Sequence, residues 1–244
     1  MSIPTQWIVP GWPVPRCVRA LITTRAGGSS CGPYTGLNLG EHVGDDAQAV
    51  RQNRDFLRQF VPSEPIWLKQ VHGKRVVEAE PQFSGEEADG SVARAPDRVC
   101  AVLSADCLPV LLADVKGTVV GIAHAGWRGL AAGIIENLVR AMGVAPGSLV
   151  AFLGPAIGAN AYEVGADVFD AFVTQDPRAR QGFAASSPGK FLADLGLLAR
   201  QRIERLGCNN IHGGNLCTYS DAARFYSFRR DGPTGRMASL VWIE

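Results

Sequence analysis

The chain has 244 residues, a net charge of +1 and no basic run, so it lacks the electrostatic footprint of a nucleic-acid-binding protein. Its composition, 46% hydrophobic and 19% charged, is ordinary for a globular protein and predicts one domain over residues 1–244. No apolar segment reaches the ~20 residues needed to cross a bilayer, and the proline-rich start lacks the charged region of a signal peptide. We therefore expect a cytoplasmic protein with six free thiols and neither membrane nor nucleic-acid partners.

The first part of the chain predicts a strand, a glycine-rich loop and a helix. The strand is expected at 18–24, and the loop that follows begins at Arg25 and leads to Asn38. Loops of this kind can bind an anion through backbone N–H groups, although composition alone favours a plain surface loop. The helix is expected over 47–60, capped by one of the two aspartates before it.

Residues 66–73 predict a strand that ends at a turn, which places His72 at the strand end. A lone histidine there is usually a satisfied polar residue, and only the candidates farther along the chain favour a ligand. Two other histidines lie in polar or glycine-rich turns and are expected to be structural: His42 and His212. The polar stretch 78–97 predicts a loop with a turn at 88–90.

Two runs rich in Val, Leu and Ile, 99–114 and 118–123, predict adjacent buried strands joined by a tight turn at 116–117. Antiparallel pairing around that turn brings Cys107 and His124 to the same end of the hairpin, within about two positions of facing each other. A sulfur and an imidazole so placed can share a metal ion or form a nucleophile–base pair.

Two neighbours of Cys107 refine this prediction. Proline is awkward in a central strand, so Pro109 predicts that Cys107 lies on an irregular connection beside the ladder. Strand alternation points the adjacent Asp106 to the opposite face, so we expect Asp106 to orient a ligand or to hold the loop.

Apolar residues at i, i+4 and i+8 predict a helix that begins near Gly129 and ends at Gly143. Arg128 then lies at the helix N-terminus, where free N–H groups and the helix dipole favour an anion. The sequence thus predicts a metal ligand beside a phosphate site.

The remaining elements alternate without a regular order. A strand at 149–152 leads into a loop, 154–158, that can close over a site together with 162–164. Further predicted elements are helices at 166–173 and 191–206, a polar excursion at 175–189, and strands at 225–229 and 237–243. Irregular mixing of strands and helices, with antiparallel hairpins, indicates an α+β fold with helices packed outside the sheets.

Five motifs now carry a resemblance to a known family: W-L-K-Q-V-H-G, S-A-D-C-L-P-V-L-L-A-D, H-A-G-W-R-G-L, L-G-P-A-I-G and F-R-R-D-G-P-T-G-R. In this order, from about Thr23 to Trp242, they resemble the bacterial YfiH family, also called the multicopper polyphenol oxidase (laccase) or peptidoglycan-editing-factor family. The resemblance implies back-to-back mixed β-sheets covered by helices. This four-layer α/β/β/α fold is similar to the catalytic domain of the cytotoxic necrotising factor deamidases.

The resemblance also implies a zinc enzyme with His72, Cys107 and His124 as metal ligands and catalytic residues. The implied reaction is phosphorolysis of adenosine, inosine, guanosine and methylthioadenosine, with adenosine deamination at the same site. Three protein ligands leave zinc an open position, and zinc lowers the pKa of a bound water toward ~7, which suits attack on purine C6. Phosphorolysis needs phosphate near the ribose C1′; its candidate ligands are Arg128, with Arg25 and Asn38 as further candidates for phosphate or ribose. The general acid or base is unassigned.

Three alternatives remain open. Cys107 and His124 can serve a thiol hydrolase or deamidase without metal. A copper-dependent polyphenol oxidase is disfavoured, because four histidines cannot furnish a mononuclear and a trinuclear copper centre, so zinc is favoured over copper. A non-enzymatic or peptidoglycan-precursor role is suggested only by the family's other name.

Overall fold

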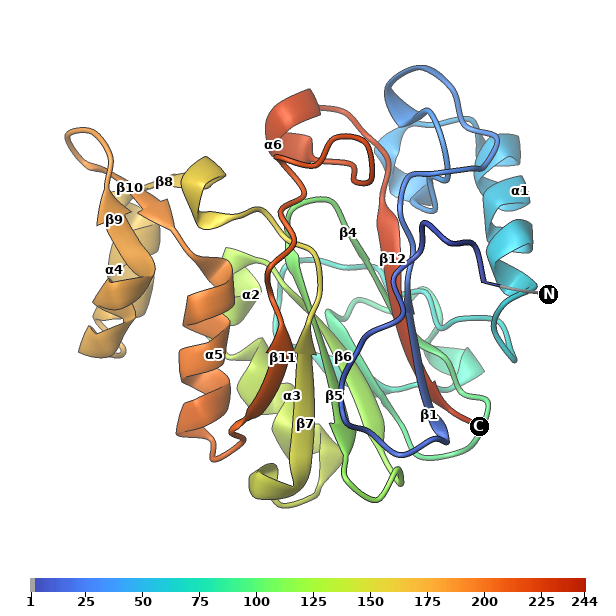
Figure 1. The fold of residues 1–244 in the computed structure, drawn as a ribbon, viewed down its shortest axis with the longest axis horizontal. Helices are drawn as coiled ribbons and strands as arrows, with labels where there is room; N and C mark the ends of the chain where they lie inside the picture. The colour runs from blue at the N-terminus through green and yellow to red at the C-terminus, as the bar shows by residue number, and fades with distance from the viewer. Residues whose placement is uncertain (1–2) are drawn as a thin grey trace.

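The protein, described over residues 3–244 by a computed structural model, is organised around two stacked β-sheets (Figure 1). The larger sheet has the strand order β11-β7-β5-β6-β3-β2. The β11–β7 and β2–β3 pairs are parallel, and the three pairs between them are antiparallel. Its strands are β2 (Val76–Glu78), β3 (Gly90–Ala93), β5 (Leu108–Asp114), β6 (Val120–Ala125), β7 (Leu149–Leu153) and β11 (Asn210–Gly213).

The other sheets are antiparallel and have three strands each. The one stacked on the large sheet has the order β1-β12-β4, with β1 (Val18–Ile22), β12 (Met237–Ile243) and β4 (Cys100–Ser104). A small sheet projects from one side of the molecule together with α4 (Figure 1). Its order is β8-β10-β9, with β8 (Glu163–Gly165), β10 (Lys190–Ala193) and β9 (Phe183–Ala185).

Helices pack around the three sheets. They are α1 (Ala47–Arg58), α2 (Trp127–Ala132), α3 (Ile134–Met142), α4 (Ala166–Val173), α5 (Leu195–Arg205) and the short α6 (Phe228–Asp231). Short 3-10 helices occupy Gly32–Tyr34, Glu41–Val43, Pro81–Phe83, Pro146–Ser148, Ala159–Ala161 and Pro177–Gly182. Within residues 3–244 no helix combines the length and the apolar character needed to cross a bilayer.

Strand alternation divides the buried residues among three layers of core. Leu111 on β5 and Val241 on β12 lie in the core between the two stacked sheets. Val110, one position from Leu111, lies on the opposite face of the large sheet in a core shared with α3 and α5. Leu240 packs on the outer face of the three-stranded sheet, in a core shared with α1. The predicted α+β fold with two sheets back to back between helices is therefore confirmed.

The β5–β6 hairpin forms in the predicted register. Leu111 faces Ile122 and Pro109 faces His124, so His124 lies two positions from the residue opposite Cys107. Cys107 lies on the bend before β5, as the sequence predicted, and the strand itself includes Pro109. The Pro109 carbonyl accepts the N–H of Gly154, one residue beyond the end of β7, so the proline lies where that pairing stops and its missing N–H is tolerated.

Four predicted boundaries need correction. Residues 66–73 form isolated bridges rather than a strand. The expected loop 78–97 contains the end of β2 and all of β3. The predicted strand 225–229 is absent, because 225–227 are irregular and 228–229 belong to α6. The predicted helix 191–206 begins only at Leu195, because the preceding residues form β10.

The helix predicted from Gly129 to Gly143 is two helices. Gly133 adopts a left-handed conformation, with φ 96°, and separates α2 from α3. Glycine tolerates this conformation because it has no Cβ, so the chain turns between two segments that both bury apolar residues. The apolar spacing alone does not reveal the break.

Leu111→Ala tests the core between the stacked sheets. Leu111 is 0% exposed, and its truncation is expected to lower the free energy of unfolding by about 2–5 kcal/mol. Val115 is 51% exposed at the hairpin end and is the matched control. Val115→Ala should change the free energy of unfolding by less than about 0.5 kcal/mol. Urea unfolding measures both values, and equal small effects would contradict the assignment of Leu111 to the shared core.

Candidate metal centre

Three side chains predicted as metal ligands converge at one end of the β5–β6 hairpin. His124 is on β6, Cys107 occupies the bend before β5, and His72 lies in the loop before β2. One ligand atom from each residue lies within 4.8 Å of the others, and Cys107 Sγ is 3.8 Å from His72 Nε2. Two imidazoles and a thiol are a donor set that suits one borderline-soft metal ion.

Asp89, expected only as part of a turn, holds two of these ligands in place. Its side chain is fully buried, and one carboxylate oxygen lies 2.9 Å from His124 Nδ1. The same carboxylate accepts the backbone N–H groups of Val71, His72 and Gly73 at 3.2, 3.0 and 2.6 Å. The contact at Nδ1 leaves His124 Nε2 free for a metal, the arrangement in which a carboxylate orients a metal-binding histidine.

The pKa values of Cys107 and His124 shift in opposite directions because each side chain favours the charged form of the other. Burial raises the pKa of the Cys107 thiol, but the charge and hydrogen bonds of His124 and His72 outweigh burial and bring it to about 6. Burial disfavours the charged form of His124, yet Cys107 and Asp89 raise its pKa to about 9. The thiolate that a metal requires is therefore available near neutral pH.

The H-A-G-W-R-G motif has glycine at two positions where neighbouring atoms leave no room for a Cβ atom. A Cβ at Gly126 would lie 2.9 Å from Cys107 Sγ and 3.0 Å from His72 Cδ2. A Cβ at Gly129 would lie 2.7 Å from the carbonyl oxygen of Gly73, in the loop that carries His72. The separations of 2.9 and 2.7 Å are shorter than real Cβ contacts, so a side chain at either position would displace the ligands or the loop that carries them.

The three ligands form part of the wall of a cavity of about 380 Å³, a size typical of small-molecule sites. Its other lining residues are His42, Gln70, Leu103, Ser104, Ala105, Asp106, Ile157, Tyr162, Phe228, Arg229 and Arg236. The loop after β7 and Tyr162 therefore contribute to this site, as the sequence suggested. His42, expected to be only structural, also lines the cavity. Burial lowers the pKa of His42, and the positive charges of Arg236 and Arg54 lower it further. Its imidazole is therefore neutral at neutral pH.

Asp106 holds the loop that carries Cys107, one of the two roles expected for it. Its backbone is left-handed, with φ 97°. Its carboxylate accepts the Thr218 hydroxyl at 2.6 Å and the Arg229 backbone N–H at 2.7 Å. The bend before β5 is thereby tied to α6, and this contact also positions Arg229.

The three residues predicted to bind phosphate or ribose lie outside the cavity lining. Arg128 is exposed at the start of α2 and stacks over Trp127 at 4.4 Å. Arg25 stacks over the Tyr226 ring at 4.8 Å. Asn38 is 0% exposed, and its side-chain oxygen accepts the backbone N–H of Arg236 at 2.9 Å. A direct role in ligand binding stays a prediction for Arg128, Arg25 and Asn38.

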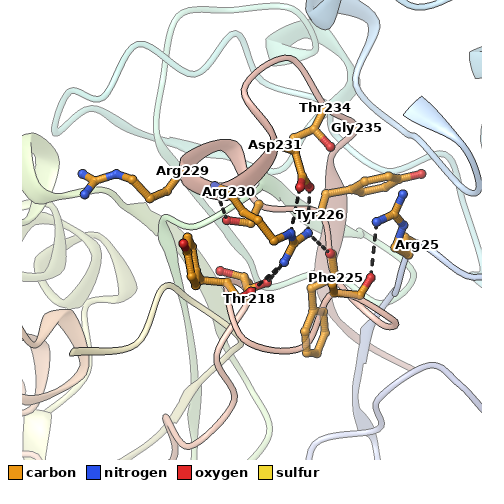
Figure 2. Close-up of polar contacts among 12 residues, drawn as sticks. Arg25, Thr218, Phe225, Tyr226, Arg229, Arg230, Asp231, Thr234 and Gly235 are labelled. Carbon is orange, nitrogen blue, oxygen red and sulfur yellow. Dashed lines mark hydrogen bonds and ion pairs between the residues drawn. The ribbon is translucent and has the colours of Figure 1, made fainter. Parts of the chain in front are cut away.

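Two adjacent arginines of the F-R-R-D-G motif have different surroundings (Figure 2). Arg230 binds the carboxylate of Asp231 through two contacts, at 2.8 and 2.7 Å. It also donates to the carbonyl oxygens of Thr218, Tyr219 and Phe225, which ties the segment before α6 together. Figure 2 shows Arg229 extending away from this cluster. Sequence reasoning missed Arg229 and Arg236 as cavity residues, and their only signal was membership of one motif.

The model of the family described as multi-copper polyphenol oxidoreductase laccase matches residues 19–244. The chain belongs to this family. It is 51% identical to a Pseudomonas aeruginosa protein named purine nucleoside phosphorylase, over 98% of both chains. It is 48% identical to the Escherichia coli protein named purine nucleoside phosphorylase YfiH, over 98% of this chain and 99% of that one. The crystal structure of a Neisseria meningitidis protein, 50% identical, matches with a TM-score of 0.97 over 98% of this chain and 100% of that one.

The laccase family's name refers to several copper ions, but this member gathers ligands for one metal. Among residues 3–244, the one group of three or more His, Cys, Asp or Glu side chains arranged to hold a metal is His72, Cys107 and His124. His212 lies on β11 and contacts Asn210 at 2.6 Å. A trinuclear copper centre requires many more histidines than this cavity contains.

Asp89→Asn tests whether the contact between Asp89 and His124 supports metal binding. An amide cannot accept all the hydrogen bonds that the carboxylate accepts, so we expect zinc affinity to fall about 10- to 100-fold, measured by competition with a chromophoric chelator. Asp114→Asn is the matched control, because the buried Asp114 carboxylate likewise accepts backbone N–H groups, of Thr118 and Val119, far from the metal ligands. It should lower stability and leave zinc affinity unchanged. Wild-type zinc affinity in Asp89→Asn would mean that Asp89 only holds the loop.

Proposed function

We propose that this chain is a zinc-dependent purine nucleoside phosphorylase that also deaminates adenosine. The observation that carries the proposal is the convergence of His72, Cys107 and His124 on the wall of one cavity. Relatives at 48–51% identity that bear the name purine nucleoside phosphorylase support the choice of reaction. The proposed substrates are adenosine, inosine, guanosine and methylthioadenosine, each with inorganic phosphate, and the proposed compartment is the cytoplasm.

The residues present fit a zinc ion. Cys107 offers a thiolate, His124 offers Nε2 because Asp89 occupies Nδ1, and His72 supplies the third ligand. When bound in a three-ligand site, zinc supplies Lewis acidity and an activated water, which is the chemistry that deamination at purine C6 requires. His42 is neutral and can donate or accept a hydrogen bond beside these ligands.

The cavity also offers surfaces suited to a nucleoside. Phe228, 57% exposed, lines the cavity and presents an aromatic face on which a purine can stack. Burial raises the pKa of the Tyr162 hydroxyl, so it keeps its proton and can donate a hydrogen bond to the sugar or phosphate. In phosphorolysis a phosphate oxygen attacks C1′, the C1′–N9 bond breaks, and its electron pair passes to the base, which takes up a proton.

One observation favours a second candidate, a thiol-dependent hydrolase or deamidase. Cys107 has a pKa of about 6 and is paired with His124, which is itself held by Asp89. A nucleophile, a base and an orienting carboxylate are the parts of a thiol catalytic triad. In this mechanism Cys107 forms a covalent intermediate and needs no metal.

The proposed reaction is tested with purified protein, adenosine and phosphate. We expect adenine and ribose 1-phosphate when phosphate is present, and inosine when it is absent, both detected by chromatography. Removal of metal by a chelator should abolish both products, and zinc should restore them. Oxidation of phenols without nucleoside cleavage would contradict the proposal and favour the activity suggested by the family's name.

Two substitutions at Cys107 separate the zinc mechanism from the thiol mechanism. Cys107→Asp keeps a possible zinc ligand but removes the nucleophilic sulfur, so we expect it to retain some zinc and detectable nucleoside turnover. Cys107→Ala should lose most of both. Metal analysis and turnover are measured together, with mass spectrometry of wild-type protein during turnover. Loss of activity in Cys107→Asp at full zinc occupancy, with a covalent adduct on wild-type Cys107, would establish the thiol mechanism instead.

A further inference from the structure

Arg236 is held rigidly at the cavity wall, with part of its guanidinium unused. Its backbone N–H donates to Asn38, and its Nη1 donates to the carbonyl oxygens of Thr234 and Gly235 at 2.8 and 3.0 Å. Gly40 packs against its stem, since a Cβ there would lie 2.8 Å from Arg236 Cγ. Nε and Nη2 have no hydrogen-bond acceptor within residues 3–244. The side chain is therefore positioned for a ligand before the ligand arrives.

Arg229 reaches the same cavity from α6. Its backbone N–H is bound by Asp106, and its Nη1 donates to the carbonyl oxygen of Glu163 at 2.8 Å. The guanidinium stacks over the Tyr162 ring, 5.2 Å from the centroid. These contacts fix the direction of the side chain and leave Nε and Nη2 without an acceptor in the described part of the chain.

Neither guanidinium is neutralised by the protein. All arginine–carboxylate pairs within 4.0 Å in residues 3–244 involve other arginines. Asp106 is the one carboxylate of the cavity lining, and its two oxygens already accept hydrogen bonds from Thr218 and Arg229. Burial lowers the pKa of Arg236, an effect that the negative charges of Cys107 and Asp106 only partly oppose. Two arginines with an unmatched charge at one cavity are a site for an oxyanion.

We infer that Arg236 and Arg229 bind the inorganic phosphate that attacks the nucleoside, in the cavity that also contains the candidate metal ligands. This assignment rests on the proposed function, because phosphorolysis needs phosphate beside the ribose. The free N–H groups of the two guanidinium groups can bind phosphate oxygens on one side of the anion, and an oxygen without such a contact can attack C1′. HPO4²⁻ forms the new C1′–O bond while C1′–N9 breaks, and the proton lost from phosphate balances the proton gained by the base. The products are ribose 1-phosphate and the free purine.

Arg236→Gln and Arg229→Gln test the site on the full zinc-loaded chain. Loss of charge-assisted hydrogen bonds is expected to raise the dissociation constant of inorganic phosphate about 10- to 100-fold, measured by phosphorus NMR without nucleoside. The KM for phosphate in phosphorolysis should rise in parallel, and the ratio of phosphorolysis to deamination should fall. Arg236→Lys, which keeps the charge, should recover part of the affinity. Arg229 is exposed, so its substitution keeps the test valid even where Arg236→Gln impairs folding.

Arg180→Gln is the matched control. Arg180 is exposed and stacks over Phe169 at 5.1 Å, as Arg229 stacks over Tyr162, but it does not line this cavity. Its phosphate affinity should equal that of the wild type. Unchanged phosphate affinity in both cavity variants would overturn the inference. A loss of phosphate affinity that appears only in Arg128→Gln would also overturn it, because it would place phosphate at the start of α2.

Two further outcomes separate this inference from the proposed function. Phosphate binding that depends on Arg236, in a protein that does not cleave nucleosides, would support the anion site and refute the phosphorylase. Phosphorolysis with an unchanged KM for phosphate in both variants would support the phosphorylase and refute the anion site. The NMR measurement is repeated with adenosine 5′-monophosphate. Weakened binding of the nucleotide but not of inorganic phosphate would assign the arginines to a substrate phosphate and overturn the inference.

Discussion

The candidate metal centre depends on the buried carboxylate of Asp89. One side chain contacts His124 Nδ1 and accepts three consecutive backbone N–H groups in the segment that carries His72. Those hydrogen bonds hold His72 in the left-handed region, at φ 58°, a conformation that few non-glycine residues adopt. Because the backbone of Asp89 also pairs with that of His124, the carboxylate links two elements that would otherwise be free to separate. The ligands are preorganised by protein contacts alone.

The cavity combines contributions from the two stacked sheets. The large sheet and its loops supply the candidate metal ligands His72, Cys107 and His124. The three-stranded sheet supplies Leu103 and Ser104 at the end of β4, and Arg236 immediately before β12. Arg229 comes from α6, and its backbone N–H is bound by Asp106 beside Cys107, so the proposed anion site and the candidate metal centre share one contact. The two sheets pack on each other through residues such as Leu111. This packing therefore fixes the distance between the candidate metal ligands and Arg236.

Local pattern was enough to predict part of this site. A tight turn and the two-residue period of strands fix the register of the β5–β6 hairpin, which placed Cys107 near His124. Asp89 was not recognisable, because its partners lie in segments distant in sequence and its neighbours have the composition of a turn. Arg229 and Arg230 are adjacent and chemically identical, and only the placement of Asp231 and three carbonyl groups decides which one is neutralised. The segment 66–73 buries Ile66 and Leu68 but forms only isolated bridges, so its strand-like composition was misleading.

The position of β12 between β1 and β4 has a consequence for the order of events during translation. Synthesis proceeds at roughly 5–20 residues per second, so the metal ligands, all between residues 72 and 124, emerge several seconds before β12. Until β12 arrives, β1 and β4 each lack the strand that pairs with them in the sheet, and each exposes unpaired backbone groups. All three candidate metal ligands are therefore synthesised while the sheet of β1 and β4 is still open. The anion site, which needs Arg229 and Arg236, is completed only as that gap closes.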